Sequence, residues 1–281
     1  TCCSGIICTA EGQNKNRHYV KNRIMTTDDG NSFREKVLYY DNFGKHTETV
    51  QVGASPQGKD LHFTFGYDIL DRPVGESLPL PDGNRNYYGD AYYYSGCVYG
   101  NSSLNRIRET YGPGAAWIEN GKSVKTEYLI NADSGELSCA EFRAEDNGED
   151  VRLIRSGLYA AGELSVARTT DEDGKVVYTF TDFEGKLLLT RRMNGTEPHD
   201  TYIVYDDRGR KRIVLPPLAA DELTATASWG CNSSEVIKKY GYVYRYDGRD
   251  RVIEKKLPGC DPVHFVYDRS DRLILKQNGN N

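Results

Sequence analysis

The sequence predicts an all-β protein built from repeated antiparallel hairpins, and three observations support this fold class. The 281 residues include 21 tyrosines and 28 glycines but only 2 methionines, and tyrosine favours strands while glycine favours the turns between them. A hexad with the pattern Tyr-Asp-x-x-Gly/Asp-Arg/Lys recurs five times. Runs of β-branched and aromatic residues, each long enough for a strand, flank these hexads, as at 263–266 and 272–275.

The first ten residues are small or apolar and carry no charge. Cys8 and Ala10 lie where small residues precede the cleavage site of an export signal. We therefore expect residues 1–12 to be the remnant of such a signal, with a disordered tail as the alternative, and we expect an extracellular, cell-surface or periplasmic protein. Lipidation at Cys2 or Cys3 stays open. No later stretch approaches the roughly 18 apolar residues of a transmembrane helix.

The other end of the chain, residues 276–281, directly follows a strand-like run, so we expect the molecule to continue beyond it. Four cysteines stand singly at Cys97, Cys139, Cys231 and Cys260. None of them has the close spacing of a zinc knuckle, so no metal site is expected. One or two disulfides and small buried thiols both remain open for these cysteines.

The five hexads are each expected to form a tight turn. The aspartate in position two can accept a hydrogen bond from the backbone N–H two residues on, and the glycine in position five supplies the left-handed residue of a bulged type I turn. At Asp71, Asp250 and Asp271 a short polar side chain replaces this glycine and tolerates the left-handed backbone. Weaker copies at 170–175 and 181–186 lack the tyrosine. The residues expected to form the repeat turns are Tyr40, Asp41, Gly44, Tyr67, Asp68, Arg72, Tyr205, Asp206, Gly209, Arg210, Tyr246, Asp247, Arg251, Tyr267, Asp268 and Arg272.

An insertion separates the third and fourth hexads, and it holds the only helical pattern. Pro216 and Pro217 end a strand, 219–225 could form a short helix, and the run 232–235 resembles a helix N-cap with its box partner. We expect one or two short helices near 217–240. After the insertion, Tyr242, Tyr244 and Tyr246 share one strand face, where packing against neighbouring strands is favoured over a stacking platform for sugars or bases.

The hexads, two of which lie 21 residues apart at Tyr246 and Tyr267, resemble the YD repeats of RHS (rearrangement hotspot) proteins, a family that includes bacterial polymorphic toxins, insecticidal toxin-complex components and the teneurins. The front half also resembles an uncharacterised domain near the N terminus of exported bacterial RHS proteins. The segments that carry the resemblance are 39–45, 51–60, 103–106, 111–114, 215–220 and 256–261.

This resemblance implies an extended curved sheet, a long ribbon that spirals into a hollow shell around a C-terminal cargo, often a toxin, which is released by self-cleavage. The chain departs from the full pattern because its good repeats are few and neither an aspartyl-protease-type motif nor a toxin domain is visible. From the resemblance we therefore expect this chain to form a wall or plug of such a shell, but we infer neither a cargo nor self-cleavage. The expected domains are 13–115, an N-terminal β domain, and 116–281, a YD-repeat region.

We expect no catalytic residue, cofactor or metal ligand in this chain. The repeat places its aspartates in turns, where they hold the backbone, and the five histidines form no HxH or HExxH spacing. His199 and Asp200 are adjacent, which favours a solvated strand end over half of a catalytic triad. A net charge of −5 with evenly spread cations argues against nucleic acid as a partner.

Two functions follow from these expectations. In the first, the chain is a non-catalytic structural segment whose partner is the remainder of its own chain, further repeats and a C-terminal domain. In the second, it is an adhesion or glycan-binding module that meets a surface glycan or protein through an aromatic cluster, for which packing of a long loop onto the sheet is the alternative. The candidate binding residues are Tyr87, Tyr88, Tyr92, Tyr93 and Tyr94.

Overall fold

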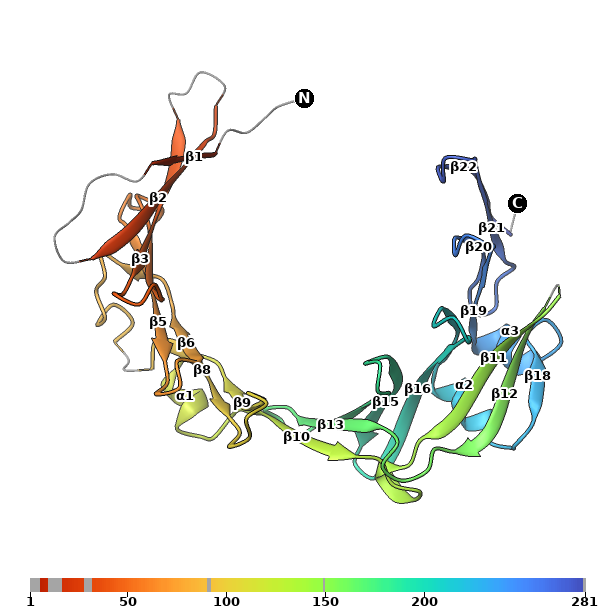
Figure 1. Cartoon of the computed structure of the whole chain (residues 1–281). Coiled ribbons are helices and arrows are strands. Elements are labelled where there is room, and N and C mark those ends of the chain that lie inside the picture. Colours follow the sequence, from red (N-terminus) through yellow and green to blue (C-terminus); the bar gives the residue numbers. More distant parts are fainter. Residues whose placement is uncertain (1–5, 10–16, 28–31, 90–91, 149, 280–281) are drawn as a thin grey trace. The chain divides into compact units, whose positions relative to one another are not determined.

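The computed structural model describes residues 6–9, 17–27, 32–89, 92–148 and 150–279, and it confirms a nearly all-β protein with a large antiparallel sheet and a few short helices (Figure 1). The chain forms two compact units, Thr1–Lys125 and Thr126–Asn281. The sequence suggested a division near residue 115, within the segment that joins the last strands of the first unit. Cys2, Cys3 and Ala10, which belong to the expected export signal, lie outside the described residues.

The first unit is an antiparallel meander in which nearly every strand pairs with the next one along the chain. The short β7 also pairs with β5. Its strands are β1 (Ile6–Thr9), β2 (His18–Met25), β3 (Phe33–Tyr40), β4 (His46–Gln51), β5 (Leu61–Tyr67), β6 (Pro73–Ser77), β7 (Leu80–Pro81), β8 (Tyr94–Tyr99), β9 (Ile107–Tyr111) and β10 (Val124–Ile130), the last of which continues into the second unit. Within the expected leader, Ile6–Thr9 therefore forms a strand against β2.

The second unit holds another antiparallel meander and a small sheet. The meander runs through β13 (Ser165–Thr170), β14 (Val176–Thr181), β15 (Leu187–Asn194), β16 (Glu197–Tyr205), β17 (Lys211–Leu215), β19 (Tyr242–Tyr246), β20 (Val252–Lys256), β21 (Val263–Tyr267) and β22 (Leu273–Gln277). The small sheet consists of β11 (Ala140–Asn147), β12 (Asp150–Leu158) and β18 (Ser228–Gly230). A 3₁₀ turn, η1 (Gly135–Leu137), precedes β11.

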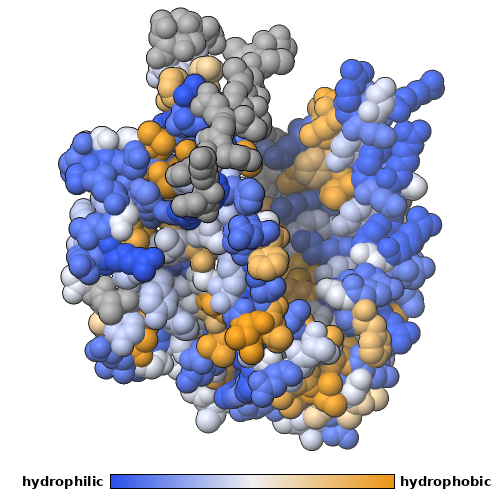
Figure 2. Space-filling model, turned by 60° about the vertical axis from the view of Figure 1, so that its left-hand side comes forward, coloured by the Kyte–Doolittle hydropathy of each residue, from blue (hydrophilic) through white to orange (hydrophobic). Residues whose placement is uncertain are grey.

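The hydrophobic core of the second unit lies between these two sheets. Phe180 on β14, Leu189 on β15 and Ile213 on β17 are fully buried, and they belong to one cluster with Leu153 of β12 and Ile237 of the insertion. The insertion therefore adds a cover to one face of the meander, which buries apolar strand residues that would otherwise face water. On the face that Figure 2 shows, hydrophilic residues predominate and hydrophobic residues lie in scattered patches.

The two helices expected near 217–240 are present as α2 (Pro217–Glu222) and α3 (Glu235–Tyr240). Proline at the start of α2 suits the first helical turn, and the Ser234 hydroxyl caps α3 by accepting a hydrogen bond from the Ile237 N–H at 3.4 Å. A third helix, α1 (Ala115–Ile118), was not predicted, since its four residues lack a side-chain cap and any apolar periodicity. Among the described residues, no helix has the length and apolar character needed to cross a bilayer.

Cys97, Cys139, Cys231 and Cys260 are free thiols, so the four described single cysteines form no disulfide with one another. Cys139 and Cys231 are buried in the core of the second unit, where burial raises the pKa of each thiol to about 12. Cys97 is half-buried and Cys260 is exposed. The buried-thiol alternative therefore holds for two of the four.

Candidate functional site

The repeated turns share one hydrogen-bond pattern, which the turn at Asp206 illustrates. The Asp206 N–H donates to the Arg210 carbonyl at 3.0 Å, and the Gly209 N–H donates to the Asp206 carbonyl at 2.9 Å. The Asp206 Oδ1 accepts from the N–H groups of Arg208 at 3.1 Å and Arg210 at 2.9 Å. The carboxylate thus satisfies two backbone donors that the turn leaves without a carbonyl partner.

The same four bonds occur in all five hexads and in the two weaker copies. We refer to their position-two residues as the turn aspartates: Asp41, Asp68, Asp171, Asp182, Asp206, Asp247 and Asp268. A further turn of this kind, which the sequence pattern missed, has Ser55 in position two. Its Oγ accepts from the Lys59 N–H at 2.7 Å, and Gly58 stands in position five with a φ of 73°.

The repeat tyrosines connect one hairpin to the hairpin before it. The Tyr67 hydroxyl donates to the His46 carbonyl at 2.8 Å. Two later repeats, in which Tyr246 donates to Lys211 and Tyr267 to Val252, have the same bond at 2.8 and 3.0 Å. In each case the accepting residue directly follows the preceding hexad. The tyrosine therefore fixes the register of its own hairpin against its neighbour.

Tyr99 occupies the same place without being part of a hexad. Its hydroxyl donates to the carbonyl of Pro73, the residue after the second hexad, at 2.9 Å, and the guanidinium of Arg72 lies 4.3 Å from its ring centroid. Sequence reasoning missed it because the loop between β8 and β9 is longer than a hexad turn. The tyrosine at the end of a strand was the only available signal.

The cation in position six stacks on the tyrosine of the next hairpin and also binds its own turn aspartate. The guanidinium of Arg251 lies 4.8 Å from the Tyr267 ring centroid, and its Nε donates to Asp247 Oδ2 at 2.7 Å. Arg210 has the same arrangement with Tyr246, at 5.1 Å, and Asp206, at 2.8 Å. Such cation–π contacts add to the hydrogen bonds at each step.

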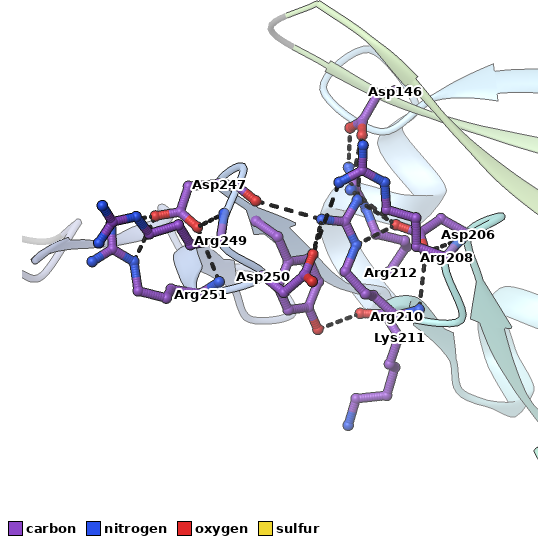
Figure 3. A network of polar contacts seen from close by, with 11 residues as sticks. Asp146, Asp206, Arg208, Arg210, Lys211, Arg212, Asp247, Arg249, Asp250 and Arg251 are labelled. Carbon is purple, nitrogen blue, oxygen red and sulfur yellow. Dashed lines mark hydrogen bonds and ion pairs between the residues drawn. The ribbon is translucent and has the colours of Figure 1, made fainter. Parts of the chain in front are cut away.

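A larger ionic network surrounds the third and fourth hexads (Figure 3). The side chain of Arg212 is only 1% exposed, and its Nη1 donates to Asp146 Oδ2 at 3.0 Å and to Asp206 Oδ2 at 3.4 Å. Burial of the Asp206 carboxyl would raise its pKa, but hydrogen bonds from the Arg210 side chain and backbone hold it below the ordinary value. Arg212 was not predicted, because its main partner Asp146 is 66 residues away in the sequence.

The five tyrosines proposed as binding residues lie in different settings. Tyr87 and Tyr88 are exposed on a turn and pack edge to face with their centroids 5.0 Å apart, and the Tyr88 hydroxyl donates to the Pro79 carbonyl at 2.7 Å. Tyr94 belongs to β8, not to a loop, and packs edge to face with Tyr93 at 6.1 Å. Tyr92 is half-buried. Tyr87, Tyr88 and Tyr94 are therefore the exposed members of the set, and Tyr87 and Tyr88 are the two that lie on the turn.

The adjacent pair of His199 and Asp200 lies on β16. Asp200 forms a bidentate ion pair with Arg191 of β15, with Nε–Oδ1 and Nη2–Oδ2 distances of 2.7 and 2.6 Å, and Tyr202 donates to Oδ2 at 3.2 Å. Arg191 and Asp200 line a pocket of about 200 Å³. The Arg191 guanidinium and the Asp200 carboxylate therefore neutralise each other. In the described part of the chain, no three His, Cys, Asp or Glu side chains gather as metal ligands.

A family model described as a domain of unknown function, DUF6443, matches residues 13–130. No curated protein matches the chain. Among solved structures, TcdB2-TccC3-Cdc42 matches 95% of this chain with a TM-score of 0.57 and 11% identity, and TcdB2-TccC3 matches 95% with a TM-score of 0.57 and 10% identity. The Tc holotoxin pore of Photorhabdus luminescens matches 93% with a TM-score of 0.57 and 11% identity.

The chain spans only about an eighth of those solved chains, since the match covers 13%, 13% and 12% of their lengths. At such low identity the comparison bears on the fold alone. The matches extend over both units of the chain, and the repeated Tyr-Asp turns occur in both. The chain therefore has an RHS/YD-repeat-like fold.

Proposed function

We propose that this chain is a non-catalytic structural segment of an exported RHS-repeat protein, where it forms or plugs part of a β-shell for a C-terminal domain. The observation that carries the proposal is the use of the repeat side chains. The turn aspartates, the repeat tyrosines and the position-six cations contact their own turn or the neighbouring hairpin. Groups engaged in this way hold strands in register and are not available for acid–base chemistry.

The solved structures support the same proposal. They include TcdB2-TccC3 and a Tc holotoxin pore, and the chain matches a part of the solved chain rather than the whole. A structural segment of a larger exported assembly fits this partial coverage. In this proposal the partner is the remainder of the protein's own chain, further repeats and a C-terminal domain, and the location is extracellular, on the cell surface or periplasmic.

The test is to read the gene past the codon for Asn281 and then to probe the encoded protein by limited proteolysis with mass spectrometry. Further Tyr-Asp hexads at about 21-residue spacing, followed by an unrelated C-terminal domain that resists protease in the intact protein, would support the proposal. A stop codon within a few residues would overturn it, since a segment of this length would have no shell to join.

An adhesion or glycan-binding module is the second candidate, and the exposed pair of Tyr87 and Tyr88 favours it. Retention of the protein on a glycan array, lost in Tyr87→Ala while the thermal unfolding midpoint stays unchanged, would support this function. Tyr93→Ala serves as the half-buried control, for which we expect a lower unfolding midpoint.

A further inference from the structure

Left-handed backbone at residues other than glycine follows a rule in this chain. Among the described residues, the non-glycine positions with positive φ are Asp71, Asp82, Asn105, Asp250 and Asp271. Such positions are uncommon, and side-chain tolerance alone does not explain why an oxygen-bearing residue occurs at some turns and glycine at others. Their surroundings separate the two cases.

Each of the five accepts a hydrogen bond or ion pair from a lysine or arginine of a turn earlier in the chain. Arg210 Nη1 lies 2.8 Å from Asp250 Oδ1, and Arg251 Nη1 lies 2.7 Å from Asp271 Oδ1. The others are Lys45 with Asp71, Lys59 with Asp82 at 2.7 Å, and Arg72 with Asn105 at 3.4 Å. In every case the cation follows the left-handed residue of its own turn.

Glycine occupies position five at turns where the space beside the residue is open. At Gly44, Gly58, Gly174 and Gly185 an added Cβ would meet nothing within 4 Å. Gly209 is the exception, because an added Cβ there would lie 2.8 Å from the Lys186 Nζ. Lys186 instead pairs with Glu184 on its own turn. Position five thus takes an acceptor side chain where the cation of an earlier turn reaches it, and Gly209 has the cation without the acceptor.

The last described hexad presents the donor side of this contact. Its cation, Arg272, has a side chain that is 78% exposed, whereas the equivalent Arg210 and Arg251 are 13% and 22% exposed beneath the next hairpin. Every residue of β22 is exposed as well. The carbonyl of Leu273 follows the hexad, as do the carbonyls of Lys211 and Val252 that accept from the next tyrosine.

We propose that Arg272 and the outer edge of β22 bind a further Tyr-Asp hairpin and select one with aspartate or asparagine, rather than glycine, in position five. The tyrosine of that hairpin stacks on Arg272 and donates to the Leu273 carbonyl, while the position-five oxygen accepts from Arg272. The inference rests on the proposed structural function and names the chemistry of the partner: an extended strand that ends in a Tyr-Asp turn, with an acid or amide in its left-handed position.

The first test stays within the chain. Gly209→Asp places a carboxylate beside Lys186, and Gly174→Asp places one where an added Cβ meets nothing within 4 Å. Both changes impose the same left-handed strain, so we expect Gly209→Asp to unfold at a higher urea midpoint than Gly174→Asp, and Lys186→Met to abolish the difference. Equal midpoints for the two aspartate variants would overturn the rule for position five.

The second test supplies the hairpin. Residues 257–277 are inserted in tandem after Gln277 in the full chain, which repeats the 21-residue spacing of Tyr246 and Tyr267. We expect the β22 amides to exchange at least tenfold more slowly in this protein. Glycine in position five of the inserted hairpin should weaken this protection about threefold to fivefold, which is the effect of losing a partly exposed ion pair. Arg272→Gln should weaken it by the same factor. The two changes together should weaken protection no more than either change alone, because both remove the same contact.

Arg269→Gln, at the tip of the same turn, is the matched control and should leave protection unchanged. Equal protection with aspartate and glycine in position five would overturn the selection by Arg272 while leaving the structural function intact. Conversely, a stop codon directly after Asn281 would remove the proposed function and leave this experiment on the β22 edge unaffected.

Discussion

Replacement of Asp206 by alanine should destabilise the second unit more than the same change at an equivalent turn. The Asp206 side chain is 5% exposed and serves two purposes. Its Oδ1 accepts from two backbone N–H groups of the turn, and its Oδ2 contacts Arg210 and the buried Arg212. Alanine removes the turn acceptor and leaves Arg212 with Asp146, whose side chain is 57% exposed, as its remaining carboxylate.

The size of the effect follows from these contacts. Two backbone hydrogen bonds contribute about 1 kcal/mol each. Loss of one carboxylate beside a buried arginine costs about 1–2 kcal/mol, below the usual cost of breaking a buried pair because Arg212 keeps Asp146. The sum is a loss of about 3–4 kcal/mol in the free energy of unfolding. Asp206→Asn keeps an oxygen for the turn N–H groups, so it should cost less than alanine.

Urea unfolding is the assay, followed by far-UV circular dichroism and by intrinsic fluorescence, to which the half-buried Trp229 of the same unit contributes. Asp247→Ala is the control, because this aspartate has the same turn bonds but no fully buried arginine beside it. The reasoning is refuted if Asp206→Ala and Asp247→Ala shift the urea midpoint equally, or if Asp206→Asn is as damaging as alanine.

Three further predictions concern acid, thiols and the tyrosine bonds. The aspartates of the five hexads have pKa values below their ordinary 3.8, because burial raises the pKa but the hydrogen bonds from positions four and six together outweigh it. Their contribution is therefore present above pH 3.8 and is lost as the pH falls through the lower folded values, so the thermal midpoint should drop steeply below about pH 4; a midpoint that stays flat from pH 5 to about pH 2 would contradict this. With a thiol reagent at neutral pH, exposed Cys260 should react quickly and buried Cys139 only after unfolding; equal rates in the folded protein would show that the core opens readily. Tyr246→Phe should lower stability by about 1 kcal/mol through loss of its hydroxyl bond, whereas Tyr87→Phe should leave the urea midpoint unchanged, and equal shifts would argue against the tyrosine bond between hairpins.

How far the sequence predicts this structure depends on the range of each interaction. The hexad turn is local, since its bonds join residues at most four apart, and the pattern of aspartate, glycine and cation predicts it even at Asp171, where tyrosine is absent. The hexad pattern did not predict the turn at Ser55, because a hydroxyl replaces the carboxylate there. The sequence did not predict the buried ion pair of Arg212, because the burial of this side chain depends on a sheet formed by residues far away in the chain.

The rule for position five illustrates a further limit. Aspartate stands in place of glycine at position 250 because its carboxylate accepts a hydrogen bond from Arg210, 40 residues earlier. The sequence alone does not show that the two turns are neighbours, because an insertion separates their hairpins. Among the candidate binding tyrosines, the pattern of aromatic residues predicted one cluster, whereas strand β8 takes up Tyr94 and leaves Tyr87 and Tyr88 on a turn.

The tyrosine bond between hairpins also determines the order in which this protein can assemble. Each turn closes through local contacts, so a hairpin can form as soon as its own residues leave the ribosome. Its tyrosine then needs only the carbonyl of a hairpin made earlier, 15 residues before in the case of Tyr267. Growth is therefore vectorial and coupled between nearest neighbours, as in a one-dimensional polymer. A defective hairpin should halt docking of those that follow while sparing those already in place.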